Sequence, residues 1–206
     1  GQLLGPVASP YREKSGAIIA DANLLLQIFD DLDSAAKLES GAAIALTTGM
    51  AAPCSAILQA VLLDMRTLAK RRNVSVRVTS DGTECRAAVD PVTVERMMSR
   101  LLSATIGMAT DQETLAVSLS ATSESILFDM DLPHALHAVA EADLFDPGYG
   151  PSGEWPDAPT LGLGFSLRLV ANMAVAVKGS LTTGANRLSL RIPSAKLTSQ
   201  DAAERV

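Results

Sequence analysis

Two glycines at the predicted start of a helix are the residues best placed to hold a ligand. Gly162 and Gly164, with Leu163 between them, come directly before a helix predicted over 164–177. Glycine lets the backbone N–H groups approach a ligand closely, and a helix N-terminus adds the positive end of its dipole. The pattern predicts an anion-binding turn, although the same spacing also occurs in tight loops that bind nothing.

Other kinds of site chemistry have less support in the sequence. The only histidines, His134 and His137, are spaced to share a helix face, but no third ligand accompanies them, so we expect no metal site. Ser166 has neither a G-x-S-x-G context nor a matching base. Two cysteines, Cys54 and Cys85, are too few for a disulfide scaffold and predict free thiols. We therefore assign no catalytic residue and no metal ligand.

Composition excludes several classes of protein. Of the 206 residues, 48% are hydrophobic but only 3% are aromatic, so the core must be aliphatic. The net charge of −6 argues against a nucleic-acid binder, which usually carries a basic face. No apolar run reaches the roughly 18 residues of a membrane span, and residues 1–10 do not resemble a signal peptide. The expected location is the cytoplasm, with a membrane tether only in segments outside this sequence.

A long helix is predicted over 11–39. Its apolar residues recur at alternating steps of four and three, which is the heptad pattern of a helix that packs along another helix. Gly41 follows the last periodic residue, as a stop signal should. An ordinary amphipathic helix packed on its own domain is the alternative. The predicted seam consists of Ile18, Ala22, Leu25, Phe29 and Leu32.

The rest of the chain alternates between helical patterns and pairs of short strands, which predicts a mixed or antiparallel sheet covered by helices on one face. The predicted helices span 53–72, 91–108, 164–177 and, as a short element, 133–144. The predicted strand pairs are 74–78 with 85–89, 115–119 with 126–130, and 180–183 with 187–192. A Pro- and Gly-rich loop over 146–160 carries the only tryptophan, Trp155. We expect this loop over 146–160 to be a lid, a binding loop or a disordered segment.

Several segments, in order, resemble the C-terminal part of two-component sensor histidine kinases. The run GLGFSLRLVANMAVAVKGSLTTGANRLSLRIPS over 162–194 resembles the last segment of their ATPase domain. Asp90 and the helix over 91–108 resemble the segment that carries the N box. The predicted first helix resembles the second helix of the dimerisation and phosphotransfer domain. The residues that match the end of that helix are Asp31, Leu32, Asp33, Lys37, Glu39 and Gly41.

This resemblance implies an α/β fold, an α+β two-layer sandwich of the Bergerat ATPase type, with a mixed sheet and three covering helices. It implies a dimerisation helix fragment over 1–41, an ATPase-like GHKL/HATPase domain over 42–194 and a polar tail over 195–206. It also implies a homodimer through 11–39 and a response-regulator receiver domain as partner. ATP and Mg²⁺ would be the cofactors of a working site.

The departures from the family pattern lie at the nucleotide site. Ala104 stands where the family's magnesium-binding Asn is expected, Arg100 where the first Asn is expected, and Gly107 where the Lys is expected. Alanine offers no oxygen to a metal that binds oxygen ligands. Asp129 or Asp131 would be the remnant of the adenine-binding Asp, but neither is followed by the family's glycines. The site is therefore expected to be vestigial, with Gly162, Leu163, Gly164 and Asp129 as what remains of it.

Three functions remain open. The favoured one is a regulatory pseudokinase or phosphotransfer scaffold in a phosphorelay, without a cofactor. The alternative is an active autokinase that binds ATP and Mg²⁺ and phosphorylates a histidine outside this chain. The third is an unrelated α/β binding domain.

Overall fold

A computed structural model describes most of the chain beyond residue 52. The described residues are 53–80, 85–149 and 161–195, together with Lys14, Ile18, Phe29, Leu32, Asp33 and Ala36. The chain divides into two compact units, residues 1–42 and 43–206, and each is described by itself. Among the described residues no helix is both long and apolar enough to cross a bilayer.

The first unit is described at six positions, all of them helical and exposed. Three of these belong to the predicted seam: Ile18 is 67%, Phe29 66% and Leu32 48% exposed. Within the part of the chain that the structure describes, these large apolar side chains are thus exposed. The other two seam residues, Ala22 and Leu25, lie outside the described residues, so the seam stays a prediction.

The second unit is built on a mixed five-stranded sheet with the order β1-β2-β3-β5-β4. Its strands are β1 (Ser75–Ser80), β2 (Thr114–Ala121), β3 (Ser125–Asp131), β4 (Ser180–Gly184) and β5 (Arg187–Pro193). β1 pairs with β2 in parallel, and every other pairing is antiparallel. The alternating apolar residues of these segments form the strands because one face of the sheet is buried.

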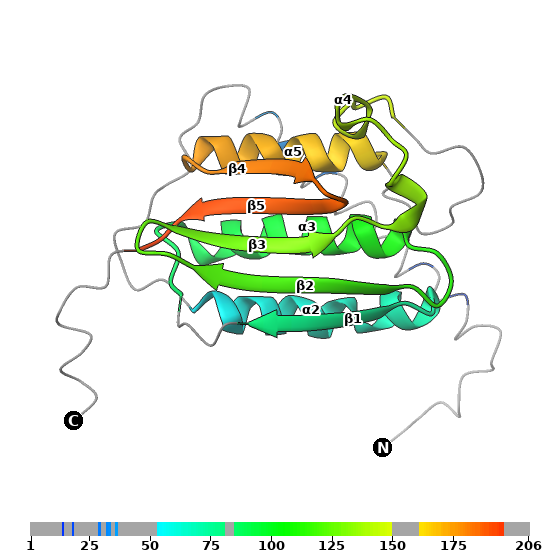
Figure 1. Cartoon of the computed structure of the whole chain (residues 1–206), viewed down its shortest axis with the longest axis horizontal. Coiled ribbons are helices and arrows are strands. Elements are labelled where there is room, and N and C mark those ends of the chain that lie inside the picture. The colour runs from blue at the N-terminus through cyan, green and yellow to red at the C-terminus, as the bar shows by residue number, and fades with distance from the viewer. Residues whose placement is uncertain are drawn as a thin grey trace, which may run out of the picture. The chain divides into compact units, whose positions relative to one another are not determined.

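Three helices cover one face of the sheet and leave the other uncovered (Figure 1). They are α2 (Cys54–Arg71), α3 (Pro91–Met108) and α5 (Leu163–Ala176). α3 begins where the sequence predicts, because the Asp90 carboxylate accepts the Thr93 N–H at 3.0 Å and Pro91 occupies the first helical position. The predicted two-layer fold with three covering helices is confirmed.

Every second side chain of a strand faces the helices. In β3 these are Ile126, Phe128 and Met130, each at most 2% exposed. The residues between them are half-buried on the uncovered face. Phe128 is the one aromatic residue among the largest fully buried side chains of the described residues, so the core is aliphatic and methionine-rich, as the composition predicts.

Two local predictions are corrected by the structure. Residues 85–89 are not the return strand of a hairpin with 74–78, because β1 pairs instead with β2. The segment forms two isolated antiparallel bridges, Pro53 with Arg86 and Ala87 with Ser194. Residues 133–144 are not one helix but the 3₁₀ turn η1 (His134–Leu136) and the single-turn helix α4 (Glu141–Leu144).

Candidate functional site

The predicted anion-binding turn lies at the N-terminus of α5. Gly162 has φ +89°, a left-handed conformation that glycine adopts without strain. Its carbonyl accepts the Ser166 N–H at 3.2 Å and the Ser166 hydroxyl at 3.0 Å. Leu163 and Gly164 are buried. The three residues thus form a tight helix start, as the sequence predicts.

The chain itself lies against these glycines. A Cβ on Gly164 would come within 1.7 Å of the Asp146 carbonyl oxygen, and one on Gly162 within 3.4 Å of the Tyr149 carbonyl oxygen. Asp146 is held in turn by the Tyr149 N–H, which donates to its carbonyl at 2.8 Å. Close packing of residues 146–149 therefore requires Gly164 whether or not an anion binds. Trp155 and the rest of the predicted lid, 150–160, lie outside the described residues.

The segment that resembles the N box presents apolar groups to its surroundings. Ala104 is 1% exposed, and Gly107 on the same helix is also buried. The neighbouring Thr105 hydroxyl donates to the Leu101 carbonyl at 2.8 Å and lies 3.7 Å from the Met130 Sδ of β3. Arg100 Nη1 donates to Met173 Sδ of α5 at 3.8 Å. The side-chain contacts of Thr105 next to Ala104 are thus with its own helix and with a thioether sulfur.

Asp129 and Asp131 lie on the uncovered face of β3. Asp129 Oδ1 accepts the Ser189 hydroxyl at 2.5 Å, across the pairing of β3 with β5. Asp131 Oδ2 accepts the Ala116 N–H at 2.8 Å, and its Oδ1 is 3.4 Å from Arg187 Nε. The residue between them, Met130, faces α3. The structure therefore does not bring Asp129 to the glycine turn, which lies in the helical layer on the other side of the sheet.

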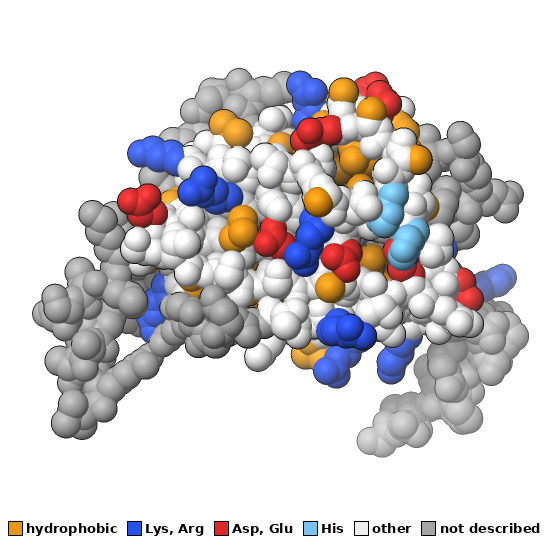
Figure 2. All heavy atoms as spheres, viewed as in Figure 1, with side chains coloured by type: hydrophobic (Ala, Val, Ile, Leu, Met, Phe, Trp, Pro, Cys, Tyr) orange, Lys and Arg blue, Asp and Glu red, His pale blue; other side chains and the backbone are white. Residues whose placement is uncertain are grey.

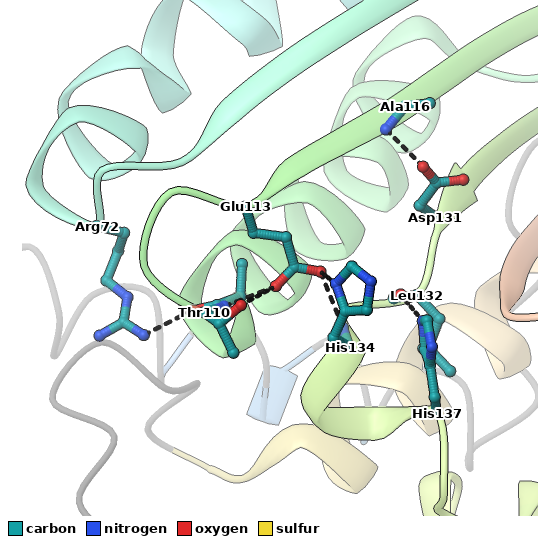
Figure 3. A network of polar contacts seen from close by, with 9 residues as sticks. Arg72, Thr110, Glu113, Ala116, Asp131, Leu132, His134 and His137 are labelled. Carbon is teal, nitrogen blue, oxygen red and sulfur yellow. Dashed lines mark hydrogen bonds and ion pairs between the residues drawn. The ribbon is translucent and has the colours of Figure 1, made fainter.

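A buried carboxylate that sequence reasoning missed lies at one end of the sheet (Figure 3). The side chain of Glu113 is 3% exposed. Its Oε2 accepts the N–H and the hydroxyl of Thr110, each at 2.7 Å, and its Oε1 accepts the His134 N–H at 2.8 Å. His134 Nδ1 also lies 2.8 Å from Oε1. Burial acts to raise the pKa of Glu113, but these hydrogen bonds outweigh it and hold the pKa below its usual value.

The two predicted histidines lie on the same side of this carboxylate (Figure 3), with ring centroids 4.8 Å apart, and only His134 bonds to it. His137 Nε2 bonds to the Leu132 carbonyl at 2.7 Å. Both rings, with Asp131 and Arg187, line a hollow of about 400 Å³. Among the described residues no group of three or more His, Cys, Asp or Glu could hold a metal ion. One part of this cluster could have been predicted from the sequence. The spacing Thr110-x-x-Glu113 resembles a capping box, which predicts the contact between these two residues.

Comparison with known proteins identifies the fold. The sequence matches no protein-family model and no curated protein. Histidine kinase AdeS of Acinetobacter baumannii superposes with a TM-score of 0.64 at 16% identity, over 96% of this chain and 89% of that one. Full-length ShkA, solved in complex with AMPPNP, gives 0.68 at 16% identity, over 94% of this chain and 41% of that one.

The catalytic domain of histidine kinase ThkA, in a nucleotide-free form, gives a TM-score of 0.53 at 13% identity over 68% of this chain and 92% of that one. At identities this low the likeness shows the fold alone. The mixed sheet with its covering helices is the fold of histidine-kinase catalytic domains, and the resemblance seen in the sequence is confirmed at that level.

Proposed function

We propose that this chain is the C-terminal module of a two-component sensor histidine kinase whose nucleotide site is degenerate. It would act as a regulatory pseudokinase, or as a phosphotransfer scaffold, for the receiver domain of a response regulator. The observation that supports this most is the apolar layer between α3 and the sheet. Ala104 occupies the position expected of the metal ligand, and Met130, not a carboxylate, extends from β3 toward α3.

Phosphoryl transfer depends on positioning and on a metal that neutralises the phosphate charge. Magnesium requires oxygen ligands. The buried polar side chains of the described residues are Thr105, Glu113 and Ser166. Each already has local partners: the Leu101 carbonyl for Thr105, Thr110 and His134 for Glu113, and the Gly162 carbonyl for Ser166. This supports a domain that has kept the kinase fold without a nucleotide site.

The scaffold role draws on the first unit. Ile18, Phe29 and Leu32 are large apolar side chains that are helical and exposed among the described residues. A second copy of the helix over 11–39 would bury them, and the paired helices would form the docking surface for the receiver domain.

The alternative is an active autokinase, and one observation favours it. Gly162, with its positive φ, and Gly164 begin a 14-residue helix, which is the geometry of an anion site. In that case the domain would bind ATP and Mg²⁺ and phosphorylate a histidine outside this chain.

Calorimetry separates the two functions. ATP is titrated into the whole chain with and without Mg²⁺, and the pseudokinase predicts no heat of binding at millimolar nucleotide. Magnesium-dependent binding with a micromolar Kd would overturn the proposal. Gly162→Ala is the matched variant, because a Cβ at φ +89° strains the turn and should abolish any binding that takes place there.

Sedimentation tests the proposed dimerisation through residues 11–39. Phe29→Glu should convert a dimer to a monomer, since it introduces a charge into the proposed seam. Val175→Glu, at a side chain that is 68% exposed on α5, is the control and should leave the mass unchanged. A wild-type chain that is monomeric at micromolar concentration would show that residues 11–39 do not dimerise in this chain.

A further inference from the structure

The only two cysteines of the chain meet in the folded protein, although 30 residues separate them in the sequence. Cys54 is the first residue of α2 and is 0% exposed, and Cys85, in the segment before α3, is 2% exposed. The Cys54 N–H donates to the Cys85 carbonyl at 2.9 Å. Besides burial, the Cys85 side chain, which lies near that of Cys54, raises the pKa of the Cys54 thiol. Both are reduced thiols in this structure.

The backbone holds the two residues in a pairing that suits a disulfide. Pro53 and Arg86 form an isolated antiparallel bridge, and the bond from the Cys54 N–H to the Cys85 carbonyl lies directly beside it. A backbone N–H···O=C bond of 2.9 Å keeps the Cα atoms of its two residues within about 7 Å of each other, and disulfides need roughly 4.4–6.8 Å. The arrangement therefore needs no large backbone movement to be bridged.

Chance is a poor explanation for this contact. A buried side chain touches roughly 6–12 other residues, so two cysteines placed at random among 206 positions would meet about one time in twenty. The segment that carries Cys85 is also well anchored. Ala87 bridges to Ser194, and the Ala88 N–H donates to the Pro193 carbonyl at 2.9 Å. The two cysteines thus lie where the start of α2 meets residues 85–88, a segment that is anchored at the end of β5.

We propose that Cys54 and Cys85 are a disulfide-forming pair, oxidised by a small-molecule disulfide to one intramolecular cystine. A thiolate of the pair attacks one sulfur of the reagent, whose S–S bond breaks and releases one thiol. The second cysteine then loses its proton and attacks the protein sulfur of the mixed disulfide, which releases the second thiol. Two protein thiols are oxidised and one reagent disulfide is reduced to two thiols, so electrons and protons balance.

The rate of this reaction depends on the state of the thiols. Burial, followed by the neighbouring Cys85, raises the pKa of the Cys54 thiol to about 12. The thiolate is the nucleophile, so the folded protein should react slowly near neutral pH and faster as the pH rises. Once formed, the cystine closes a loop that contains α2 and β1, and this should stabilise the fold.

The test uses the whole chain and oxidised glutathione. One sample is incubated folded at pH 7 and at pH 9, and another is refolded from urea with the same reagent. Intact mass without reductant, peptide mapping and the Tm are then measured. The intact mass should show the loss of two hydrogen atoms, and peptide mapping should show a peptide that links Cys54 to Cys85. The Tm should lie roughly 5–10 °C above that of the reduced protein.

Cys54→Ala and Cys85→Ala are the matched controls, since each leaves one thiol. Their Tm should not rise with oxidised glutathione, and their mass should stay unchanged or increase by one glutathione. The pair is confirmed when the cystine forms in either wild-type sample with the raised Tm. Its absence from both samples, disulfides between chains in place of the internal one, or a Tm below that of the reduced protein would overturn the proposal.

Discussion

The two faces of the sheet in residues 53–195 differ sharply in chemistry. Toward the helices, β3 presents Ile126, Phe128 and Met130, and α3 meets them with Ala104 and a hydroxyl that bonds within its own helix. On the uncovered face the same strand carries Asp129 and Asp131. Acidic and basic side chains are spread over that face in Figure 2. The carboxylates of this strand are thus held on the solvent side, paired with Ser189 and Arg187.

This difference bears on the proposal that the chain keeps the histidine-kinase fold without a nucleotide site. A buried layer needs apolar side chains for its stability, and polar groups there must find partners or cost free energy. A bound nucleotide and its metal could supply such partners. The buried hydroxyls of the helical layer, those of Thr105 and Ser166, instead donate to carbonyls at their own helices, so they do not need a ligand as partner.

The strongest test of the two faces places the same charge on each. Met130→Asp introduces a carboxylate into the buried layer beside Thr105, and we expect a loss of about 4 kcal/mol in the free energy of unfolding. Leu127 lies three residues earlier on the same strand, on the uncovered face, and is paired with Arg191. Leu127→Asp should therefore lower the free energy of unfolding by less than about 1 kcal/mol. Urea unfolding measures both. Similar losses would mean that the faces do not differ as described.

The next largest effect is expected at the glycine turn. In Gly164→Ala the new Cβ would overlap the Asp146 carbonyl, so residues 146–149 or α5 must shift, at a cost of about 2–4 kcal/mol. Gly184→Ala is the control, because a Cβ there meets nothing within 4 Å, and it should change stability by less than about 1 kcal/mol. Thermal unfolding compares the two. A neutral Gly164→Ala would show that residues 146–149 do not pack tightly on the turn.

Much of this architecture could be predicted from local sequence signals. Asp90 and Pro91 predict the start of α3, and the alternation over 126–130 predicts β3 together with its buried face. The same alternation already implies that Asp129 and Asp131 share the opposite face, because side chains of a strand alternate with a period of two. The hypothesis that Asp129 is a remnant of the nucleotide site rests on motif spacing. It does not take into account that strand alternation places Asp129 on the face opposite the helices.

Long-range pairing could not be predicted in the same way. The valines at 74–78 predict a strand but not its partner, and the nearest alternating segment is not the one that pairs with β1. The Cys54–Cys85 contact and the Glu113–His134 contact likewise join residues far apart in sequence. Their spacing carries no signal, since each depends on how several elements pack together.

A smaller effect tests why one carboxylate is tolerated in a buried position. Glu113→Gln should lower the free energy of unfolding by about 1–3 kcal/mol at neutral pH, since it weakens charge-assisted bonds from Thr110 and His134. The pKa of Glu113 is lower in the folded protein than its unfolded value of 4.5. The ionised carboxylate therefore stabilises the fold fully above pH 4.5, and this stabilisation is lost as the pH falls through the pKa of the folded state. Wild type and Glu113→Gln should therefore have similar free energies of unfolding once the pH is below the pKa of Glu113 in the folded state.

Urea unfolding of both proteins between pH 3 and pH 7 measures this convergence. Thr122→Ala is a suitable control, since its hydroxyl accepts and donates only within an exposed turn. A difference between wild type and Glu113→Gln that does not change with pH would indicate that the charge of Glu113 is not what stabilises the cluster.

The smallest effect is expected on the uncovered face itself. Ser189→Ala removes the hydroxyl that donates to Asp129, and both side chains are half-buried there, where water can replace the lost partner. The loss should therefore be about 1 kcal/mol or less, measured by urea unfolding. A loss above about 3 kcal/mol would mean that Asp129 is effectively desolvated. The uncovered face would then need a covering partner of its own, and the contrast with the helical face would no longer be one between a solvated and a buried surface.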